Sequence, residues 1–255
     1  MQPRGGAQGR PAALPGCGSR RPGRSHSQIG ASITPYGLAV VSHLELMGVP
    51  VVNGATAISR SRDKLRSLQL LSMSGIAVPR TVMAHKHSQV SRLVEEVGGL
   101  PVIIKLLRGT QGVGVMIAHT REEARTIVQT FWDLGQEVML QEYVSEAHGA
   151  DVRVLVVGKE AVGAMRRQAK KGEFRSNIHR GGRASPVSLP SSVLGMAVKA
   201  AQVLGLGLSG VDLLESRNGY RVMEVNSSPG FEGLEKATGR DIARQIVDYA
   251  GALKR

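Results

Sequence analysis

Two short apolar segments near the carboxyl end of the chain, joined by a turn, most constrain how it can fold. Residues 208–215 and 220–226 are mostly apolar. Between them, Ser216-Arg217-Asn218-Gly219 is typical of a β-hairpin turn. The segment therefore predicts two antiparallel strands.

Three oxygen-bearing side chains interrupt this hairpin: Asp212, Glu224 and Asn226. Glu224 and Asn226 are two residues apart on one strand, so they point to the same face. If the strands pair around the turn, Asp212 can lie opposite them. Two carboxylates and an amide suit a hard divalent cation, especially Mg²⁺ shared with substrate phosphates. By itself the hairpin is equally compatible with solvated acidic residues.

A phosphate site is indicated by Lys105 and the segment that follows it. Lys105 lies within an otherwise apolar strand predicted for residues 101–107, so its ammonium needs an anionic partner. In GTQGVG, residues 109–114, glycines let backbone N–H groups approach phosphate oxygens. The segment is not a P-loop, because no Gly-Lys-Ser/Thr follows it. An ordinary glycine turn is the alternative reading, but the two features together favour phosphate.

The next two apolar strands carry further candidates. Gln141-Glu142-Tyr143 ends a strand predicted for residues 137–143 and could present backbone groups to an adenine edge. An ordinary strand end explains it equally well. In the strand predicted for residues 151–157, Asp151 and Arg153 alternate on one face, and we expect them to pair only with each other.

The net charge of +13 is concentrated in two places. Residues 1–28 hold five arginines and no acid, and residues 166–183 hold seven Lys and Arg against Glu173. The remainder of the chain is nearly neutral, which argues against a general nucleic-acid-binding surface. We read the second stretch as one basic loop around Arg175, Ser176 and Asn177, either solvated or forming an anion clamp. Phe174 is its one aromatic residue, which gives little support for base stacking.

Composition also limits the cellular setting. Cys17 is the one cysteine, so a disulfide framework and a cysteine metal site are excluded. No apolar run approaches the length of a membrane span or a signal-peptide core, and we expect a cytoplasmic protein. Residues 1–28, rich in Gly, Pro, Arg and Ser, are predicted to be a disordered basic tail rather than a transit peptide or nucleic-acid arm.

From Ile29 onward, helices and strands are mixed, and several neighbouring strands look antiparallel. This predicts an α+β fold. Asp63 is expected to cap a helix over residues 64–74, and Thr120 with Glu123 forms a capping box for a helix ending at Leu134. The other predicted helices cover residues 38–47, 88–97, 191–204 and 241–254. The other predicted strands cover residues 49–52, 81–84, 115–118 and 161–167.

Several ordered sequence runs resemble the ATP-grasp ligases, in particular the RimK-type glutamate ligases. The runs are SRSRDKLRSLQLL, IIKLLRGTQGVGV, LQEYVSEAHGADVRVLVVG, GEFRSNIHRGG, GVDLL and MEVNSSPGFEGLEKATGRDIA. The resemblance implies an ATP-grasp fold, in which two α/β subdomains clasp ATP, over residues 60–255. These subdomains would be an N-subdomain at about 60–145 and a metal-binding C-subdomain at 146–255. Residues 29–59 would be a partial pre-ATP-grasp α/β domain.

The resemblance also implies a role for each matching residue. Lys105 would hold ATP phosphates under the loop GTQGVG, with Lys64 as a further phosphate-side lysine. Glu142 and Tyr143 would lie beside the adenine and Asp151 beside the ribose. Arg175, Ser176 and Asn177 would contact nucleotide and phosphate. The residues implied in catalysis are Lys105, Arg175 and Asn177, and the implied metal ligands are Asp212, Glu224 and Asn226.

The implied reaction uses ATP and two Mg²⁺ or Mn²⁺ ions to add glutamate to the C-terminus of ribosomal protein S-six through an acyl phosphate. An acidic protein C-terminus would suit the basic loop. Two alternatives stay open: a ligase of the same fold acting on a small molecule or carrier protein, and a non-enzymatic nucleotide or RNA binder. A membrane partner is not expected, and a homo-oligomer is compatible with the sequence.

The chain departs from the family pattern at its N-terminus. Family members begin with a complete small α/β domain, whereas here the matching part runs from IGASITPYG to VPVVN. We expect either a misassigned start or a truncation. Such an incomplete domain is expected to expose sheet edges and apolar surface.

Overall fold

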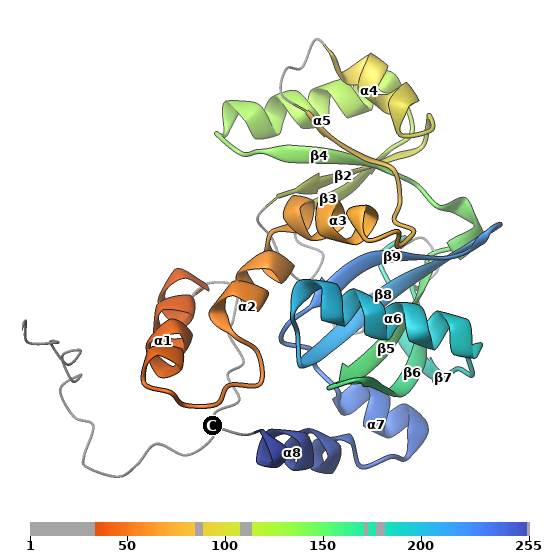
Figure 1. Cartoon of the computed structure of the whole chain (residues 1–255). Helices are drawn as coiled ribbons and strands as arrows, with labels where there is room; N and C mark the ends of the chain where they lie inside the picture. Colours follow the sequence, from red (N-terminus) through yellow and green to blue (C-terminus); the bar gives the residue numbers. More distant parts are fainter. Residues whose placement is uncertain (1–33, 85–88, 108–113, 171–172, 177–181, 254–255) are drawn as a thin grey trace, which may run out of the picture.

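The computed structural model describes residues 34–84, 89–107, 114–170, 173–176 and 182–253. The expected basic tail, residues 1–28, and residues 29–33 lie outside this part. The described helices are α1 (Thr34–Leu46), α2 (Ala55–Arg62), α3 (Lys64–Met73), α4 (Val90–Glu96), α5 (Arg121–Asp133), α6 (Ser191–Leu204), α7 (Glu232–Thr238) and α8 (Ile242–Ala252), with the 3₁₀ helix η3 (Ser145–Ala147). The molecule is α+β, as expected, and its helices pack against two antiparallel sheets (Figure 1).

The smaller sheet has four strands in the order β1-β4-β2-β3: β1 (Thr81–Ala84), β4 (Val138–Glu142), β2 (Val102–Leu106) and β3 (Val115–Ala118). All its pairings are antiparallel. Alternate side chains, including Val102, Ile104 and Leu140, pack under α4 and α5. The opposite face therefore carries the residues in between: Thr81, Ile103, Lys105, Met139 and Gln141.

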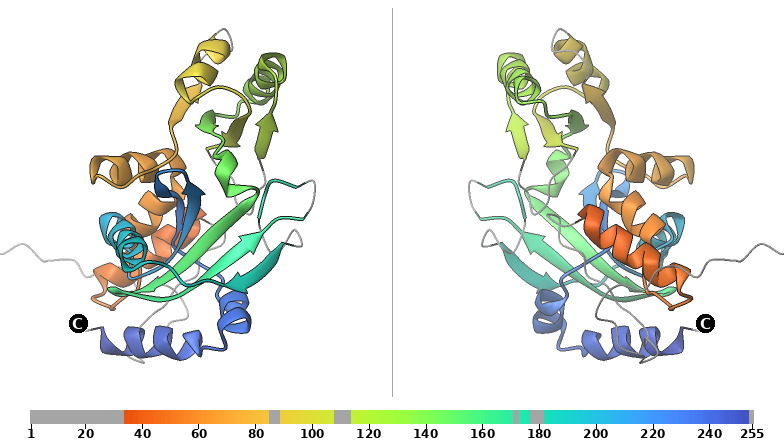
Figure 2. Two further views of the ribbon diagram at one scale, coloured as in Figure 1. Left: turned by 90° about the vertical axis from the view of Figure 1, so that its right-hand side faces the viewer. Right: turned by 90° about the vertical axis from the view of Figure 1, so that its left-hand side faces the viewer.

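The larger sheet has five antiparallel strands in the order β7-β6-β5-β8-β9: β7 (Arg183–Pro186), β6 (Glu160–Gln168), β5 (Ala150–Val157), β8 (Leu208–Ser216) and β9 (Gly219–Asn226). Helices α6 and α3 pack on one face, over Val152, Val154 and Leu213. On the other face, α7 and α8 cover one end of the sheet, around Leu155 and Leu208. Figure 2 shows α8 at the end of the molecule away from the smaller sheet. The uncovered part of this second face carries the polar residues of the site.

Asn53 joins the N-terminal helices to the larger sheet. Its buried amide donates to the carbonyl oxygens of Leu208 and Ser227, both at 2.8 Å. Its oxygen accepts from the backbone N–H groups of Gly207 (2.8 Å) and Leu208 (3.0 Å). One side chain therefore satisfies four backbone groups at the entrance to β8.

Helix α1 exposes apolar side chains. Tyr36 is 73% exposed and Leu46 77% exposed, whereas Val41 is buried against Ile58 of α2. Because α1 is apolar around its circumference, packing on α2 covers only part of it.

Local signals predicted several elements well. The Asp63 cap accepts from the Arg66 N–H at 2.8 Å, and the capping box at the start of α5 is present. The hairpin pairs as expected. The strand expected at residues 49–52 is not found among the described residues: Val51 and Asn53 are isolated bridge residues there, and Asn53 pairs with Leu206. Helices α2 and α7 and strand β7 were not predicted.

No helix within the described ranges combines the length and the apolar character needed to cross a membrane.

Candidate active site

The hairpin β8–β9 brings its three oxygen-bearing residues to one face. Asp212 lies directly opposite Glu224, and Asn226 lies opposite Gly210. A register shift follows Asp212, where β9 carries one extra residue before Val222. The Asn226 Nδ2 donates to Asp212 Oδ2 at 3.3 Å. The expected placement of Asp212 opposite the oxygen-bearing residues of β9 is therefore confirmed.

Asp212 is held by two arginines of neighbouring strands. Arg153 of β5 donates to both carboxylate oxygens at 2.7 Å, and Arg167 of β6 lies 2.9 Å from Oδ2. Asp212 is only 3% exposed. Burial alone would raise the pKa of Asp212, but the guanidinium groups of Arg153 and Arg167 outweigh it and hold the pKa below its ordinary value. Asp212 is therefore an ionised carboxylate at neutral pH.

The expected pairing of Asp151 with Arg153 is wrong. Asp151 instead accepts two hydrogen bonds from Arg167, at 2.5 and 2.6 Å, and one from the Ser176 hydroxyl. The reason is strand register: Arg167 lies opposite Asp151, and Asp212 lies opposite Arg153. Directly opposed side chains on adjacent strands are closer than side chains two residues apart on one strand. The result is a buried row of alternating charges across β6, β5 and β8.

Lys105 approaches this row from the smaller sheet. It is 8% exposed, and its Nζ donates to Gln141 Oε1 at 2.6 Å. Burial lowers the pKa of Lys105 to about 8, against the opposing effect of the Glu224 carboxylate; Lys64 lowers the pKa further and Asp212 raises it. Lys64, at the start of α3, also has a pKa lowered by burial and opposed by Glu224. Lys105 of the smaller sheet, Lys64 of α3 and the two carboxylates of the larger sheet thus act on one another electrostatically.

Glu142, at the end of β4, is bound by two arginines. Its Oε2 accepts from the backbone N–H of Arg80 (3.1 Å), the Arg80 side chain (3.2 Å) and Arg221 of β9 (2.6 Å). These arginines outweigh burial and lower the pKa of Glu142. Its carboxylate therefore links the smaller sheet to the larger one. Tyr143, the next residue, is partly buried.

The basic stretch 166–183 is not the single loop that we expected. Arg166 and Arg167 belong to β6, within the strand predicted for residues 161–167, and Arg183 begins β7; Arg167 is buried in the charge row. Arg175 pairs with Glu173 at 2.8 Å and lies over the Phe174 ring at 5.3 Å. Asn177 lies outside the described residues, as do residues 109–113 of the glycine segment. Their expected roles stay predictions.

The residues present fit a Mg²⁺ ion. Asp212, Glu224 and Asn226 offer carboxylate and amide oxygens, the donors that Mg²⁺ prefers. Glu224 is partly exposed and has no ion pair or hydrogen bond to its carboxylate within the described part of the chain. No cluster of three or more His, Cys, Asp or Glu gathers among the described residues. The three hairpin residues would hold the ion.

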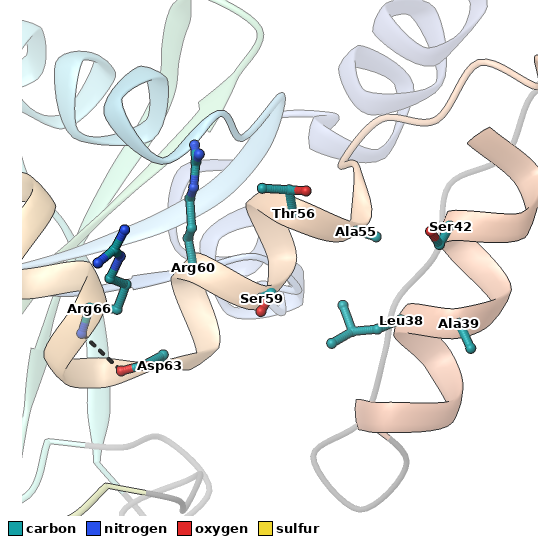
Figure 3. A pocket seen from close by; sticks show the side chains of 9 residues that line it. All are labelled: Leu38, Ala39, Ser42, Ala55, Thr56, Ser59, Arg60, Asp63 and Arg66. Carbon is teal, nitrogen blue, oxygen red and sulfur yellow. Dashed lines mark hydrogen bonds between the residues drawn. The ribbon is translucent and has the colours of Figure 1, made fainter. Parts of the chain in front are cut away.

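A separate pocket of about 540 Å³ opens between α1, α2 and the start of α3 (Figure 3). None of the predicted site residues lines it. Asp63, which lines this pocket, caps α3 by accepting a hydrogen bond from the Arg66 N–H. The pocket is therefore not part of the candidate active site.

Three residues of the site were missed or misplaced by sequence reasoning: Arg153, Arg167 and Gln141. A signal for all three existed, since charged or amide side chains within apolar strands need buried partners. The identity of those partners depends on strand order, which the sequence pattern does not reveal.

Comparison with known proteins agrees with this geometry. Residues 61–250 match the model of the RimK-like ATP-grasp domain, and residues 27–58 match that of the RimK PreATP-grasp domain. The chain is 55% identical over 222 residues to a probable alpha-L-glutamate ligase of Vibrio parahaemolyticus, covering 87% of this chain and 74% of that protein.

Two solved structures have a similar fold. The ATP-grasp ligase PsnB, complexed with a phosphomimetic variant of its minimal precursor, Mg and ADP, has a TM-score of 0.68 at 26% identity. The match covers 87% of this chain and 68% of PsnB. The D-alanine–D-alanine ligase of Bacillus anthracis has a TM-score of 0.66 at 18% identity, covering 83% of this chain and 74% of that one, and shows likeness of fold alone. The chain belongs to the RimK-like ATP-grasp family and is a ligase that forms carbon–nitrogen bonds.

Proposed function

We propose that this protein uses ATP and Mg²⁺ to add glutamate to the carboxyl terminus of a protein, with ribosomal protein S-six as the acceptor. Its relatives named as alpha-L-glutamate ligases support glutamate as the amino substrate. The neighbour PsnB, bound to a precursor, supports a peptide acceptor. The reaction would take place in the cytoplasm, where ATP, glutamate and ribosomal proteins meet.

One observation carries the proposal. The buried ammonium of Lys105 lies close enough to Glu224 and Asp212 for their charges to raise its pKa against the effect of burial. A cation from one sheet and oxygen donors from the other therefore converge on one place. A nucleoside triphosphate with its metal ion needs this combination, since its oxygens bind both an ammonium and a hard cation.

The proposed reaction has two steps. The acceptor carboxylate attacks the γ-phosphorus of ATP, the bond to the β-phosphate oxygen breaks, and an acyl phosphate and ADP form. The glutamate amine then attacks the acyl carbon and phosphate leaves, giving an amide and releasing a proton. Neither step requires a covalent bond to the enzyme, which agrees with the absence of cysteine from residues 34–255.

The candidate residues have different roles in this scheme. Mg²⁺ held by Asp212, Glu224 and Asn226 would supply positive charge beside the phosphate oxygens. Lys105 would donate hydrogen bonds to those oxygens as charge moves onto ADP. Arg153 and Arg167 keep Asp212 ionised and oriented, so it can act as a ligand. We propose that Arg175 and Asn177 complete the charge stabilisation, with Tyr143, Asp151 and Ser176 on the nucleoside side.

Mass spectrometry tests the proposal directly. The protein is incubated with ATP, Mg²⁺ and glutamate together with a peptide of the S-six carboxyl terminus, and in parallel with small carboxylates. Added glutamyl units on the peptide, with one ADP per unit, are expected. If only the small carboxylates are glutamylated, the acceptor is a small molecule and not the S-six peptide. If ATP binds but no ADP is released in any mixture, the ligase assignment is overturned.

A further inference from the structure

A row of polar side chains crosses three strands of the smaller sheet, on the face away from α4 and α5. Thr81 of β1 lies directly opposite Gln141 of β4, and Gln141 lies diagonally across from Lys105 of β2. Gln141 is 2% exposed. Its Oε1 accepts from Lys105 Nζ at 2.6 Å, and its Nε2 donates to Thr81 Oγ1 at 2.9 Å. The ammonium is thus linked through one amide to a hydroxyl two strands away.

The hydrogen bonds in this row run in one direction. The Thr81 hydroxyl has a single hydrogen, which it donates to the Pro79 carbonyl oxygen at 2.9 Å. Towards Gln141 the hydroxyl can therefore only accept, so it must meet the NH₂ end of the amide. The carbonyl end is left facing Lys105. The main-chain oxygen of Pro79 thus decides which way round the buried amide sits.

We propose that Thr81 and Gln141 form a positioning pair for Lys105, which holds the ammonium ready for ATP phosphate; this rests on the phosphate role proposed above for Lys105. An ammonium has three N–H donors. Gln141 takes one of them and supplies no negative charge. The other two N–H groups meet no further hydrogen-bond or ion-pair partner among the described residues, so they are available to phosphate oxygens.

A neutral acceptor is the right chemistry for this task. A carboxylate in place of Gln141 would form a buried ion pair with Lys105 and compete with phosphate for it. A reversed amide would point an NH₂ group at the ammonium and repel it. Thr81 prevents the reversal, because its hydroxyl offers no hydrogen towards Gln141. The pair is therefore expected to govern affinity for ATP while having little effect on the amino substrate.

The experiment compares Thr81→Val with the matched control Thr81→Ser, using titration calorimetry with Mg·ATP, ligation kinetics and thermal melting. Valine keeps the shape but removes the acceptor for the amide. We expect Thr81→Val to raise the Kd and KM for ATP about tenfold, with the KM for glutamate unchanged. Thr81→Ser should stay within about twofold of the original protein, because it keeps the hydroxyl. A purely structural role would lower the melting temperature without separating the two KM values.

Gln141→Glu is the second variant, and it keeps side-chain size. We expect it to weaken ATP binding more than tenfold, because the new carboxylate would form an ion pair with Lys105 and compete with phosphate for the ammonium. Lys105→Ala separates the two hypotheses. If Lys105→Ala binds ATP normally, the proposed phosphate role of Lys105 is refuted, and the positioning pair is refuted with it. If Lys105→Ala weakens binding but Thr81→Val and Gln141→Glu bind ATP normally, the positioning pair alone is refuted.

Discussion

The charge row predicts that Asp212→Asn and Glu224→Gln will differ sharply in stability, although both replace a proposed metal ligand by its amide. Asp212 accepts three charge-assisted hydrogen bonds from Arg153 and Arg167, at 2.7 to 2.9 Å, in a nearly fully buried position. Asparagine removes the charge that these arginines neutralise. Arg167 keeps its ion pair with Asp151, but Arg153 loses the carboxylate that it binds.

The size of the effect follows from this geometry. Removing one member of a buried ion pair costs about 3–5 kcal/mol, because the remaining charge stays desolvated. For a chain of this length the loss corresponds to a fall of roughly 10 °C in melting temperature. Glu224 is partly exposed and makes no ion pair within the described residues. Its replacement should change the free energy of unfolding by about 0.5 kcal/mol or less.

The assay is urea denaturation followed by circular dichroism, without Mg²⁺ or nucleotide, so that only the protein's own interactions count. Asp212→Asn should unfold at clearly lower urea, and Glu224→Gln at the same urea as the original protein. If the free energy of unfolding of Asp212→Asn lies within about 1 kcal/mol of that of the original protein, the charge-row reasoning is refuted. In ligation assays Glu224→Gln should be inactive despite its intact fold, and full activity at low Mg²⁺ would refute the metal assignment.

Three further predictions concern other parts of the molecule. The affinity for ATP should be constant below pH 7 and fall as pH rises above about 8, approaching tenfold per pH unit, because Lys105 loses its proton there; calorimetry at several pH values measures this. Asn53→Ala should lower the free energy of unfolding by about 3 kcal/mol or more, since four backbone hydrogen bonds lose their partner; urea denaturation measures this. Thr120→Ala should cost about 1 kcal/mol by removing the cap of α5, measured in the same way.

Each of these has its own control. Lys105→Arg keeps its charge across this pH range, so its affinity for ATP should not fall near pH 8. If the affinity falls equally in both proteins, deprotonation of Lys105 is not the cause. Asn53→Asp retains the two accepted bonds but sets a buried carboxylate against the carbonyl oxygens of Leu208 and Ser227, so it should be no more stable than Asn53→Ala. Thr120→Ser should retain stability, and equal losses for Ser and Ala would contradict the capping explanation.

Much of the fold was predictable wherever the signal is local. The Asp63 cap, the capping box at Thr120 and Glu123 and the turn after Ser216 each involve residues within four positions of one another. Such contacts form in nearly the same way whatever surrounds them. The predictions fail where contacts between residues far apart in the sequence determine the structure. Residues 49–52 read as a strand, but the described residues hold isolated bridges at Val51 and Asn53, and the Asn53 side chain binds the backbone of β8, about 155 residues away.

For the site, the sequence alone determined the chemical types: two carboxylates and an amide on one hairpin, and a lysine within an apolar strand. The hairpin turn sets the register as far as Leu213 and Val222, which alone would place Met223 opposite Asp212; the one-residue shift after Asp212 brings Glu224 there instead. Only the tertiary structure decided the partners. Strand order places β5 between β6 and β8, which gives Asp212 two arginines and joins Asp151 to Arg167 instead of Arg153. The physical reason is that burial makes every charge depend on its nearest neighbour, and in a sheet that neighbour lies on another strand.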